Sequence, residues 1–377
     1  MSYKCHDDKD KPKFAVGEVL KNYEISEEIG HGAFLVVYKA KEIGLGGNVI
    51  ALKCYSLRSK FKACAETELA NFGLIGKHKN IANDFIEQIA YRYEDVDRTA
   101  LILPLAVGDL FYIMKSRGQL PLGLAYDGLI QVTAGLGHLH SRNFAHGDIK
   151  PENVLVYLSK TEWCLKLTDF EGLLHYDKSG VTMNDVRITS EYAPPEYILQ
   201  DEFKKSSDIW SLGCLFYEMC TQSSMFSLHG DSYGSESADS DVSRNESERK
   251  SEMHDEKEND DDTDYEETLS ANDIMHLTMI VNHIGPFPKR VASDNSDVFT
   301  RNGHVRNIKH SVSSIEELLM DNGVGKTGAD IVGGIIRPMM SYFSGKRPSC
   351  SAILKGEKPV FLPYFEEDSV TRVSAKD

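Results

Sequence analysis

The ten-residue stretch from His146 to Leu155, HGDIKPENVL, constrains the fold and chemistry of this chain more than any other. It places Asp148, Lys150 and Asn153 within one short loop. The aspartate can accept a hydroxyl proton, the lysine can steady a transferring phosphate, and the asparagine can hold a metal ion. Because these three roles serve one reaction, the stretch predicts a phosphoryl-transfer site.

A further acidic residue follows sixteen positions after Asn153, in the segment Leu167–Gly172, LTDFEG. Asp169 comes at the end of an expected strand. A carboxylate at such a place can chelate a Mg²⁺ ion that bridges nucleotide phosphates. The spacing therefore adds Asp169 to the predicted metal ligands.

Gly30 and Gly32 lie upstream in a glycine-rich segment, GHGAFLVV. Glycines in a turn between strands let backbone amides approach phosphates without a Cβ in the way. An ordinary tight turn would show the same two glycines, so both interpretations stay open here. The apolar runs that follow predict strands over residues 36–40 and 49–53, separated by a turn over 44–48.

Lys53 ends the second of these strands, in the run Ile-Ala-Leu-Lys. A lysine that points from a strand below a glycine-rich turn can hold phosphate oxygens, although most lysines simply lie on the surface. A helix is expected over residues 63–76, and Glu68 in it can pair with Lys53. Glu66 is the rival partner, but choosing Glu68 places Phe72 and Ile75 on one apolar face.

The rest of the chain divides into a small β-rich part and a larger helical part. A strand is expected over residues 99–103 and a helix over 126–140. The stretch 222–270 is rich in Ser, Asp and Glu and poor in large apolar residues, so it cannot bury enough surface to offset its ordering entropy. Apolar segments at 208–220 and 273–284 flank it, which indicates an insert within a folded region.

Charge and cysteine usage limit the classes of partner and compartment. Residues 231–267 carry 16 acidic and four basic residues and hold most of the net charge of −16. We therefore expect no direct binding to nucleic acid, and a basic partner suits the chain better. The seven cysteines are scattered, and none forms a CxxC pair. We expect free thiols in a reducing compartment, the cytoplasm or the nucleus. No stretch approaches the about 18–20 apolar residues of a spanning helix, so no membrane partner is expected.

Three more segments follow: TSEYAPPE at 189–196, DIWSLG at 208–213 and KRPS at 346–349. In this order, the motifs together resemble the eukaryotic protein kinases over roughly residues 14–357. The resemblance implies an α+β, bilobal protein kinase fold, with a small β-rich N-lobe, a larger helical C-lobe, and ATP between the lobes.

The resemblance also sets the expected boundaries. It places the N-lobe at residues 14–104 and the C-lobe at residues 105–357. Residues 1–13 and the acidic insert 222–270 are expected to be disordered, and residues 358–377 are expected to form a C-terminal tail.

The same resemblance implies a role for each charged residue of the motifs. Asp148 would act as the base or orient the hydroxyl, and Lys150 would steady the γ-phosphate. Lys53, with Glu68, would grip the α- and β-phosphates. The implied ligands of Mg²⁺ are Asn153 and Asp169, and the other implied ATP-binding positions are Gly30, Gly32, Val37, Ala51, Leu103, Ala106 and Leu155.

Some of these positions are implied to contact the base of the nucleotide. Val37, Ala51 and Leu155 would sandwich the adenine, Leu103 matches the gatekeeper, and Ala106 would offer its backbone to the base.

Other motif residues are implied to support the fold. Glu196 would pair with Arg347, and Asp208 would brace the loop that carries Asp148. Lys150 and Thr189 match the serine/threonine type of kinase. The implied partners are protein substrates, and we expect a monomer.

A narrower resemblance is to the SR-protein kinases of the CMGC group. It is carried by the segments HGD at 146–148, HLTMI at 276–280, IGPFP at 284–288 and VFTRNGHVRNI at 298–308. That family phosphorylates basic Arg/Ser-rich segments read by an acidic groove. Glu316, Glu317 and Asp321 lie where groove acids are implied, and a solvated helix face is the alternative.

Three departures from the family pattern keep two functions open. Leu35 replaces a small residue of the glycine-rich loop. Gly147 replaces the arginine that would pair with a phosphorylated activation loop, so control by loop phosphorylation is not expected. Glu171 replaces the glycine after Asp-Phe. The sequence therefore predicts an active serine/threonine kinase, with a nucleotide-binding pseudokinase scaffold as the alternative.

Overall fold

The structure is a computed structural model, and it describes residues 14–31, 35–44, 46–56, 59–75, 91–94, 98–158, 162–176, 186–228 and 269–356. The predictions for residues 1–13, for residues 229–268 of the acidic insert, for residues 358–377 and for Gly32 fall outside these ranges. The chain divides into two compact units. The first holds the described residues up to Phe72 and from Tyr91 to Leu105, and the second holds residues 73–75 and those from Ala106 onward.

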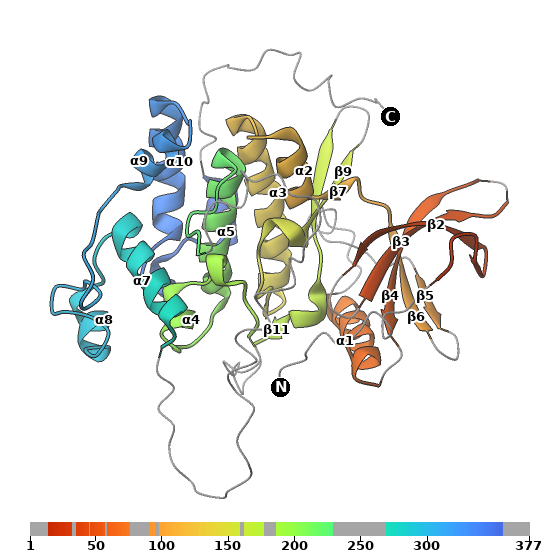
Figure 1. The fold of residues 1–377 in the computed structure, drawn as a ribbon, viewed down its shortest axis with the longest axis horizontal. Coiled ribbons are helices and arrows are strands. Elements are labelled where there is room, and N and C mark those ends of the chain that lie inside the picture. Colours follow the sequence, from red (N-terminus) through yellow and green to blue (C-terminus); the bar gives the residue numbers. More distant parts are fainter. Residues whose placement is uncertain are drawn as a thin grey trace, which may run out of the picture. The chain divides into compact units, whose positions relative to one another are not determined.

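The first unit is built on one antiparallel sheet with the strand order β1-β2-β3-β4-β6-β5 (Figure 1). The register pairs Val37 of β3 with Lys53 of β4, and Ala51 of β4 with Leu103 of β6. The six strands are β1 Val19–Leu20, β2 Tyr23–His31, β3 Leu35–Glu42, β4 Val49–Ser56, β5 Tyr91–Glu94 and β6 Arg98–Pro104. The strands predicted over 36–40, 49–53 and 99–103 are confirmed; the first and third extend beyond both predicted ends, and the second extends only at its carboxyl end.

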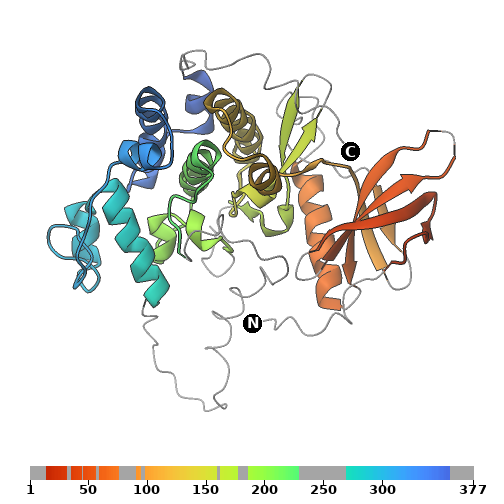
Figure 2. The ribbon, with the colours of Figure 1, turned by 45° about the horizontal axis from the view of Figure 1, so that its top comes forward.

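The period-two pattern of these strands gives the sheet two buried faces. On one face, Val36, Tyr38 and Ala40 pack with Leu52 and with other apolar residues. On the other face lies α1, which spans Ser59–Ile75 (Figures 1 and 2). The helix predicted over 63–76 begins four residues earlier than expected, because residues 59–62 contain no helix breaker and continue the first turn.

The second unit is mostly helical. Its central helix α5, Lys205–Thr221, is buried along nearly its whole length and packs against α3, Leu122–Ser141, which contains the helix predicted over 126–140 (Figures 1 and 2). The other helices are α2 Leu110–Arg117, α4 Pro195–Ile198, α7 Ala271–Ile284, α8 Lys289–Asp294, α9 Ile315–Asp321, α10 Lys326–Met339 and α11 Cys350–Lys355.

Two small antiparallel sheets of the second unit position the motif residues. One has the order β10-β9-β7, with β7 Gly108–Asp109, β9 Val154–Leu158 and β10 Trp163–Leu167. The other pairs β8, Phe144–Ala145, with β11, Leu174–His175. The loop 146–153 runs from β8 to β9, and Asp169 follows the end of β10. The two sheets therefore fix both ends of the predicted catalytic segments.

The first part of the predicted acidic insert is folded, which corrects the expected start at residue 222. Met225, Phe226 and Leu228 are buried, and Phe226 stacks on Trp210 of α5 with ring centroids 6.0 Å apart. At the far end, Ser270 is the N-cap of α7 in a capping box with Asp273. The prediction was wrong at these edges because three apolar side chains suffice to anchor a short, otherwise polar segment.

The predicted α+β class, with a smaller β-rich unit and a larger helical unit, is confirmed. Among the described residues, no helix is both long and apolar enough to span a membrane.

Candidate active site

Asp148 is held by four donors within the second unit. Its Oδ1 accepts hydrogen bonds from the amide and the hydroxyl of Thr189, at 3.0 and 2.7 Å. Its Oδ2 accepts from Asn153 Nδ2 at 3.0 Å and pairs with Lys150 Nζ at 3.0 Å. These four contacts fix the orientation of the carboxylate. The three motif residues predicted to act together therefore lie in direct contact.

Lys150 connects Asp148 with the segment that follows the Asp169 motif. Its ammonium also donates to Thr189 Oγ1 at 2.8 Å. Burial by itself would lower the pKa of Lys150, but the negative charges of Asp148, Glu152 and Asp169 outweigh it, and the pKa is raised overall. Lys150 therefore keeps its positive charge throughout the neutral range.

Asn153 and Asp169 fit the predicted role of Mg²⁺ ligands. The amide nitrogen of Asn153 donates to the carbonyl and the carboxylate of Asp148, at 2.8 and 3.0 Å, which leaves its oxygen as the ligating atom. Asp169 adopts a left-handed backbone with φ of 65° just before the buried Phe170. Two oxygen ligands from the protein suit Mg²⁺, which keeps waters and binds phosphates for the rest of its shell.

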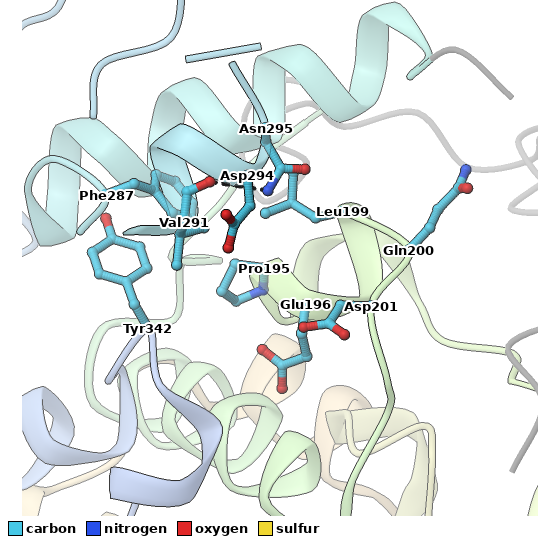
Figure 3. A pocket seen from close by; sticks show the side chains of 10 residues that line it. All are labelled: Pro195, Glu196, Leu199, Gln200, Asp201, Phe287, Val291, Asp294, Asn295 and Tyr342. Carbon is cyan, nitrogen blue, oxygen red and sulfur yellow. Dashed lines mark hydrogen bonds between the residues drawn. The ribbon is translucent and has the colours of Figure 1, made fainter. Parts of the chain in front are cut away.

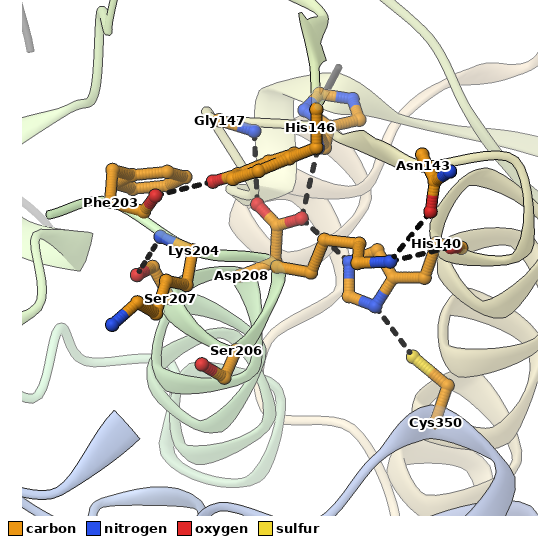
Figure 4. Close-up of polar contacts among 12 residues, drawn as sticks. His140, Asn143, His146, Gly147, Phe203, Lys204, Ser206, Ser207, Asp208 and Cys350 are labelled. Atoms are coloured by element: carbon orange, nitrogen blue, oxygen red, sulfur yellow. Dashed lines mark hydrogen bonds and ion pairs between the residues drawn. The ribbon is translucent and has the colours of Figure 1, made fainter. Parts of the chain in front are cut away.

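A buried carboxylate supports the loop that carries Asp148 (Figure 4). Asp208 of α5 accepts hydrogen bonds from the amides of His146 and Gly147, both at 2.9 Å. Gly147 has a φ of +84°, a backbone conformation that residues with a side chain rarely adopt, and this accounts for the glycine at this position. The predicted bracing role of Asp208 thus corresponds to two direct hydrogen bonds.

Asp208 also contacts His140 of α3, and this contact was missed by the sequence analysis. His140 Nε2 lies 2.8 Å from Asp208 Oδ2, and His140 Nδ1 lies 3.5 Å from the sulfur of Cys350 (Figure 4). Burial raises the pKa of the Cys350 thiol to about 12, so it stays protonated and can donate to Nδ1. Residues 140 and 350 are too far apart in sequence for any local pattern to link them.

In the first unit, Lys53 pairs with Glu68 as predicted. Lys53 Nζ lies 3.0 Å from each carboxylate oxygen of Glu68, and the side chains are 12% and 2% exposed. Glu66 is exposed, so the helical-face argument selected the right glutamate. Tyr55 donates a hydrogen bond to the same carboxylate, and the sequence analysis had not singled it out.

The predicted ATP-binding positions lie on neighbouring strands of each unit. In the first unit, Gly30 of β2 pairs with Val37 of β3, and Ala51 and Leu103 are buried partners on β4 and β6. In the second unit, Leu155 lies on β9, and Ala106 precedes β7. These predicted nucleotide contacts stay predictions.

Leu35, the first departure from the family pattern, has a packing role. It begins β3 and packs against the buried cluster of Tyr55, Ala65 and Leu101. Its size therefore serves the contact between the sheet and α1.

A separate cavity of about 370 Å³ lies near α4 and α8 in the second unit (Figure 3). Leu199, Phe287 and Val291 form apolar walls, and Asp201 and Asp294 contribute carboxylates. Of the predicted catalytic, ATP-binding and metal-binding residues that the structure describes, none lines it.

Comparison with known proteins identifies the class of this fold and site. The family described as protein kinase domain matches residues 23–356. A crystal structure of a kinase domain aligns over 93% of this chain and 98% of its own, with a TM-score of 0.67 and 19% identity. These findings confirm the predicted protein kinase fold.

The curated relatives point to the same family. An Aurora kinase of Yarrowia lipolytica is 30% identical over 200 residues, which cover 53% of this chain and 52% of the relative. The serine/threonine-protein kinase ULK3 of Homo sapiens is 32% identical over 204 residues, which cover 53% of this chain and 41% of the relative. The matches thus span about half of each relative or less. The chain belongs to the protein kinase domain family.

Proposed function

We propose that this chain is an active serine/threonine protein kinase, which transfers the γ-phosphate of ATP to serine or threonine hydroxyls of protein substrates. The observation that carries the proposal is the Asp148 carboxylate, oriented by Lys150, Asn153 and Thr189. A carboxylate fixed in this way is ready to receive a substrate hydroxyl without rearranging first.

Each charged residue then has one role. Asp148 orients the substrate hydroxyl and takes its proton, and Lys150 stabilises the negative charge of the transferring phosphate. Lys53, held by Glu68, contacts the α- and β-phosphates. Asn153 and Asp169 would hold Mg²⁺, which supplies neutralisation of phosphate charge. Catalysis on this proposal consists mostly of positioning and electrostatic stabilisation.

The expected substrates are basic, Arg/Ser-rich segments, as in the SR-protein kinases. The sequence segments shared with that family and the acidic balance of the chain support this choice. Two of the three acids assigned to the groove have other partners. Glu316 pairs with Arg337, and Glu317 caps the start of α9. The substrate preference therefore rests on the sequence resemblance.

We further propose that the chain acts as a monomer in a reducing compartment, the cytoplasm or the nucleus. All six cysteines of the described ranges are free thiols, and four of them are buried. Free buried thiols are usual where disulfides do not form.

The direct test is phosphate transfer from radiolabelled Mg²⁺-ATP to two peptides, one Arg/Ser-rich and one acidic. Asp148→Asn protein, checked for folding by circular dichroism, serves as the blank. Transfer to the Arg/Ser-rich peptide alone, absent in the blank, supports both the kinase and its substrate class. Transfer to the acidic peptide alone would support the proposed kinase activity and contradict the proposed Arg/Ser-rich substrate class.

Absence of transfer to either peptide would favour a pseudokinase that binds nucleotide without turning it over. The observation that favours this alternative is the position of Glu171. It is partly buried and is the middle residue of the short 3₁₀ turn Phe170–Gly172, which directly follows Asp169. A second carboxylate there can repel phosphate. If Glu171→Gly gains activity over an inactive parent, the pseudokinase is supported, and an active parent ends it.

A further inference from the structure

Tyr55 lies two residues after Lys53 on β4, so both side chains project from the same face of the sheet. That face is covered by α1, which carries Glu68. The Tyr55 ring is fully buried in a cluster with Ala65 and Leu101, and its hydroxyl reaches the Glu68 carboxylate. Strand and helix are thus joined at Glu68 by two neighbouring side chains of β4.

The Glu68 carboxylate is nearly inaccessible to water, since the side chain is 2% exposed. A buried carboxylate is tolerated only with a charge partner and hydrogen-bond donors for its lone pairs. Lys53 supplies the charge, at 3.0 Å from both oxygens, and Tyr55 supplies a neutral donor to Oε2. The hydroxyl therefore satisfies one of the carboxylate lone pairs that the ammonium alone does not saturate.

We propose that Tyr55 is a positioning residue that holds Glu68, and through it Lys53, in the arrangement required for ATP binding. This proposal rests on the proposed kinase function. The ammonium of Lys53 must divide its three donors between Glu68 and the phosphates. The Tyr55 hydroxyl keeps Glu68 and α1 in place while the ammonium of Lys53 also contacts the phosphates.

The competing interpretation is that Tyr55 only fills space between the sheet and α1. The variant Tyr55→Phe distinguishes the two interpretations, because it keeps the buried ring and removes only the hydroxyl. A loss of packing or folding would lower the amount of active enzyme and hence the maximal rate. A loss of positioning would raise the KM for ATP and leave the KM for the peptide unchanged.

Tyr38 offers a matched control on the neighbouring strand β3. It is a buried tyrosine whose hydroxyl accepts a hydrogen bond from the amide of Phe14 at 3.2 Å, and its neighbours are apolar residues on the other face of the sheet. We expect Tyr55→Phe to lower kcat/KM for ATP about tenfold, which is the scale of one hydrogen bond to a charged group. Tyr38→Phe should change it less than about twofold. Equal effects from the two variants would overturn the proposal.

A double-mutant cycle shows whether Tyr55 acts through Glu68. If it does, Tyr55→Phe made in a Glu68→Ala background should lower kcat/KM by less than about twofold, because that background has no oxygen left to accept the Tyr55 hydroxyl. Independent, multiplicative effects of the two changes would mean that Tyr55 acts by another route, and the proposal would fail.

A measurement that does not depend on enzymatic activity separates the test of Tyr55 from the test of the kinase function. Acetylation of Lys53 by acetic anhydride, followed by mass spectrometry, reports how firmly Glu68 holds the amine. Lys39, which pairs with the exposed Glu27 at 2.7 Å, is the internal reference. We expect Lys53 to be labelled about tenfold faster in Tyr55→Phe and at the parent rate in Tyr38→Phe. If the parent shows no kinase activity, the proposed function fails, and this labelling alone decides the role of Tyr55: unchanged labelling overturns it.

Discussion

Replacement of Glu196 by glutamine should destabilise the second unit far more than loss of an ordinary ion pair. Glu196 of α4 and Arg347 form two parallel contacts at 2.6 and 2.7 Å, and the side chains are 8% and 0% exposed. Arg347 also donates to the carbonyl oxygens of Ser341 and Ser206. Glutamine has nearly the same size as glutamate, so the change removes the charge and turns one acceptor into a donor facing the guanidinium.

The expected cost follows from burial. Removing one partner of a buried ion pair costs about 3–5 kcal/mol, because the other charge stays desolvated and unpaired. The second unit contains a control pair at similar distances: Arg337 Nη2 contacts both carboxylate oxygens of Glu316, at 2.5 and 2.6 Å, but the Glu316 and Arg337 side chains are 22% and 54% exposed. Glu316→Gln should cost at most about 1 kcal/mol. The two pairs have similar nitrogen–oxygen distances and differ chiefly in the exposure of their side chains.

The assay is urea denaturation followed by tryptophan fluorescence. The chain has two tryptophans, Trp163 and Trp210, and both lie in the second unit. Trp210 is itself buried, and its ring centroid lies 5.2 Å from the guanidinium carbon of Arg347. The Glu196→Gln/Arg347→Met double variant should be more stable than Glu196→Gln, because it removes the stranded charge. The reasoning is refuted if Glu196→Gln costs no more than Glu316→Gln.

Three further predictions follow from the ionisation of single groups. The pKa of His283, which stacks on Phe226, is lowered by burial, so the unfolded chain binds its proton more tightly; stability should fall as the pH drops below about 6.5, and His283→Gln should flatten this fall in urea melts at pH 7.5 and 5.5. The pKa of Glu316 is lowered: its burial acts in the opposite direction, but the bonds to Arg337 outweigh it. Its contribution to stability should therefore be present above about pH 4.5 and lost as the pH falls further, and comparison of parent and Glu316→Gln melts at pH 6 and 4 measures the loss. Burial raises the pKa of Cys214, Cys220 and Cys350, so in the native protein iodoacetamide at about pH 8 should alkylate the partly exposed Cys64 and Cys164 before these three, as peptide mapping would show.

The sequence predicted contacts where chain geometry alone forces residues together. Asp148, Lys150 and Asn153 belong to one short loop, so a single turn brings them into contact. Lys53 and Glu68 lie on a strand and the helix that follows it, and helical periodicity was enough to choose Glu68 over Glu66. Both arguments need only local geometry, and local geometry is what periodicity encodes.

Contacts that depend on tertiary packing could not be predicted in this way. Thr189 reaches Asp148 only because the chain returns after 41 residues, and Cys350 reaches His140 only because α11 packs on α3. Tyr55 is an intermediate case. Strand alternation places it on the same face as Lys53, but its hydroxyl meets Glu68 only once α1 has docked on the sheet. The signal for its face was present in the sequence, and the signal for its partner was not.

The acids near residue 320 show how local physics can outweigh a family resemblance. The resemblance assigned Glu316, Glu317 and Asp321 to a substrate groove by their position in the chain. Yet Ser314-Ile-Glu-Glu317 is also a capping-box pattern, and Glu317 accepts from the Ser314 amide at 2.7 Å, as that pattern predicts. Glu316 forms an ion pair with Arg337 of α10. Substituting either residue would loosen α9 as well as remove a charge, so weaker phosphorylation of a basic peptide by such a variant would not identify a substrate groove. Asp321, exposed at the end of α9, is the acid of the three at which charge can be changed without removing a cap or an ion pair of this helix.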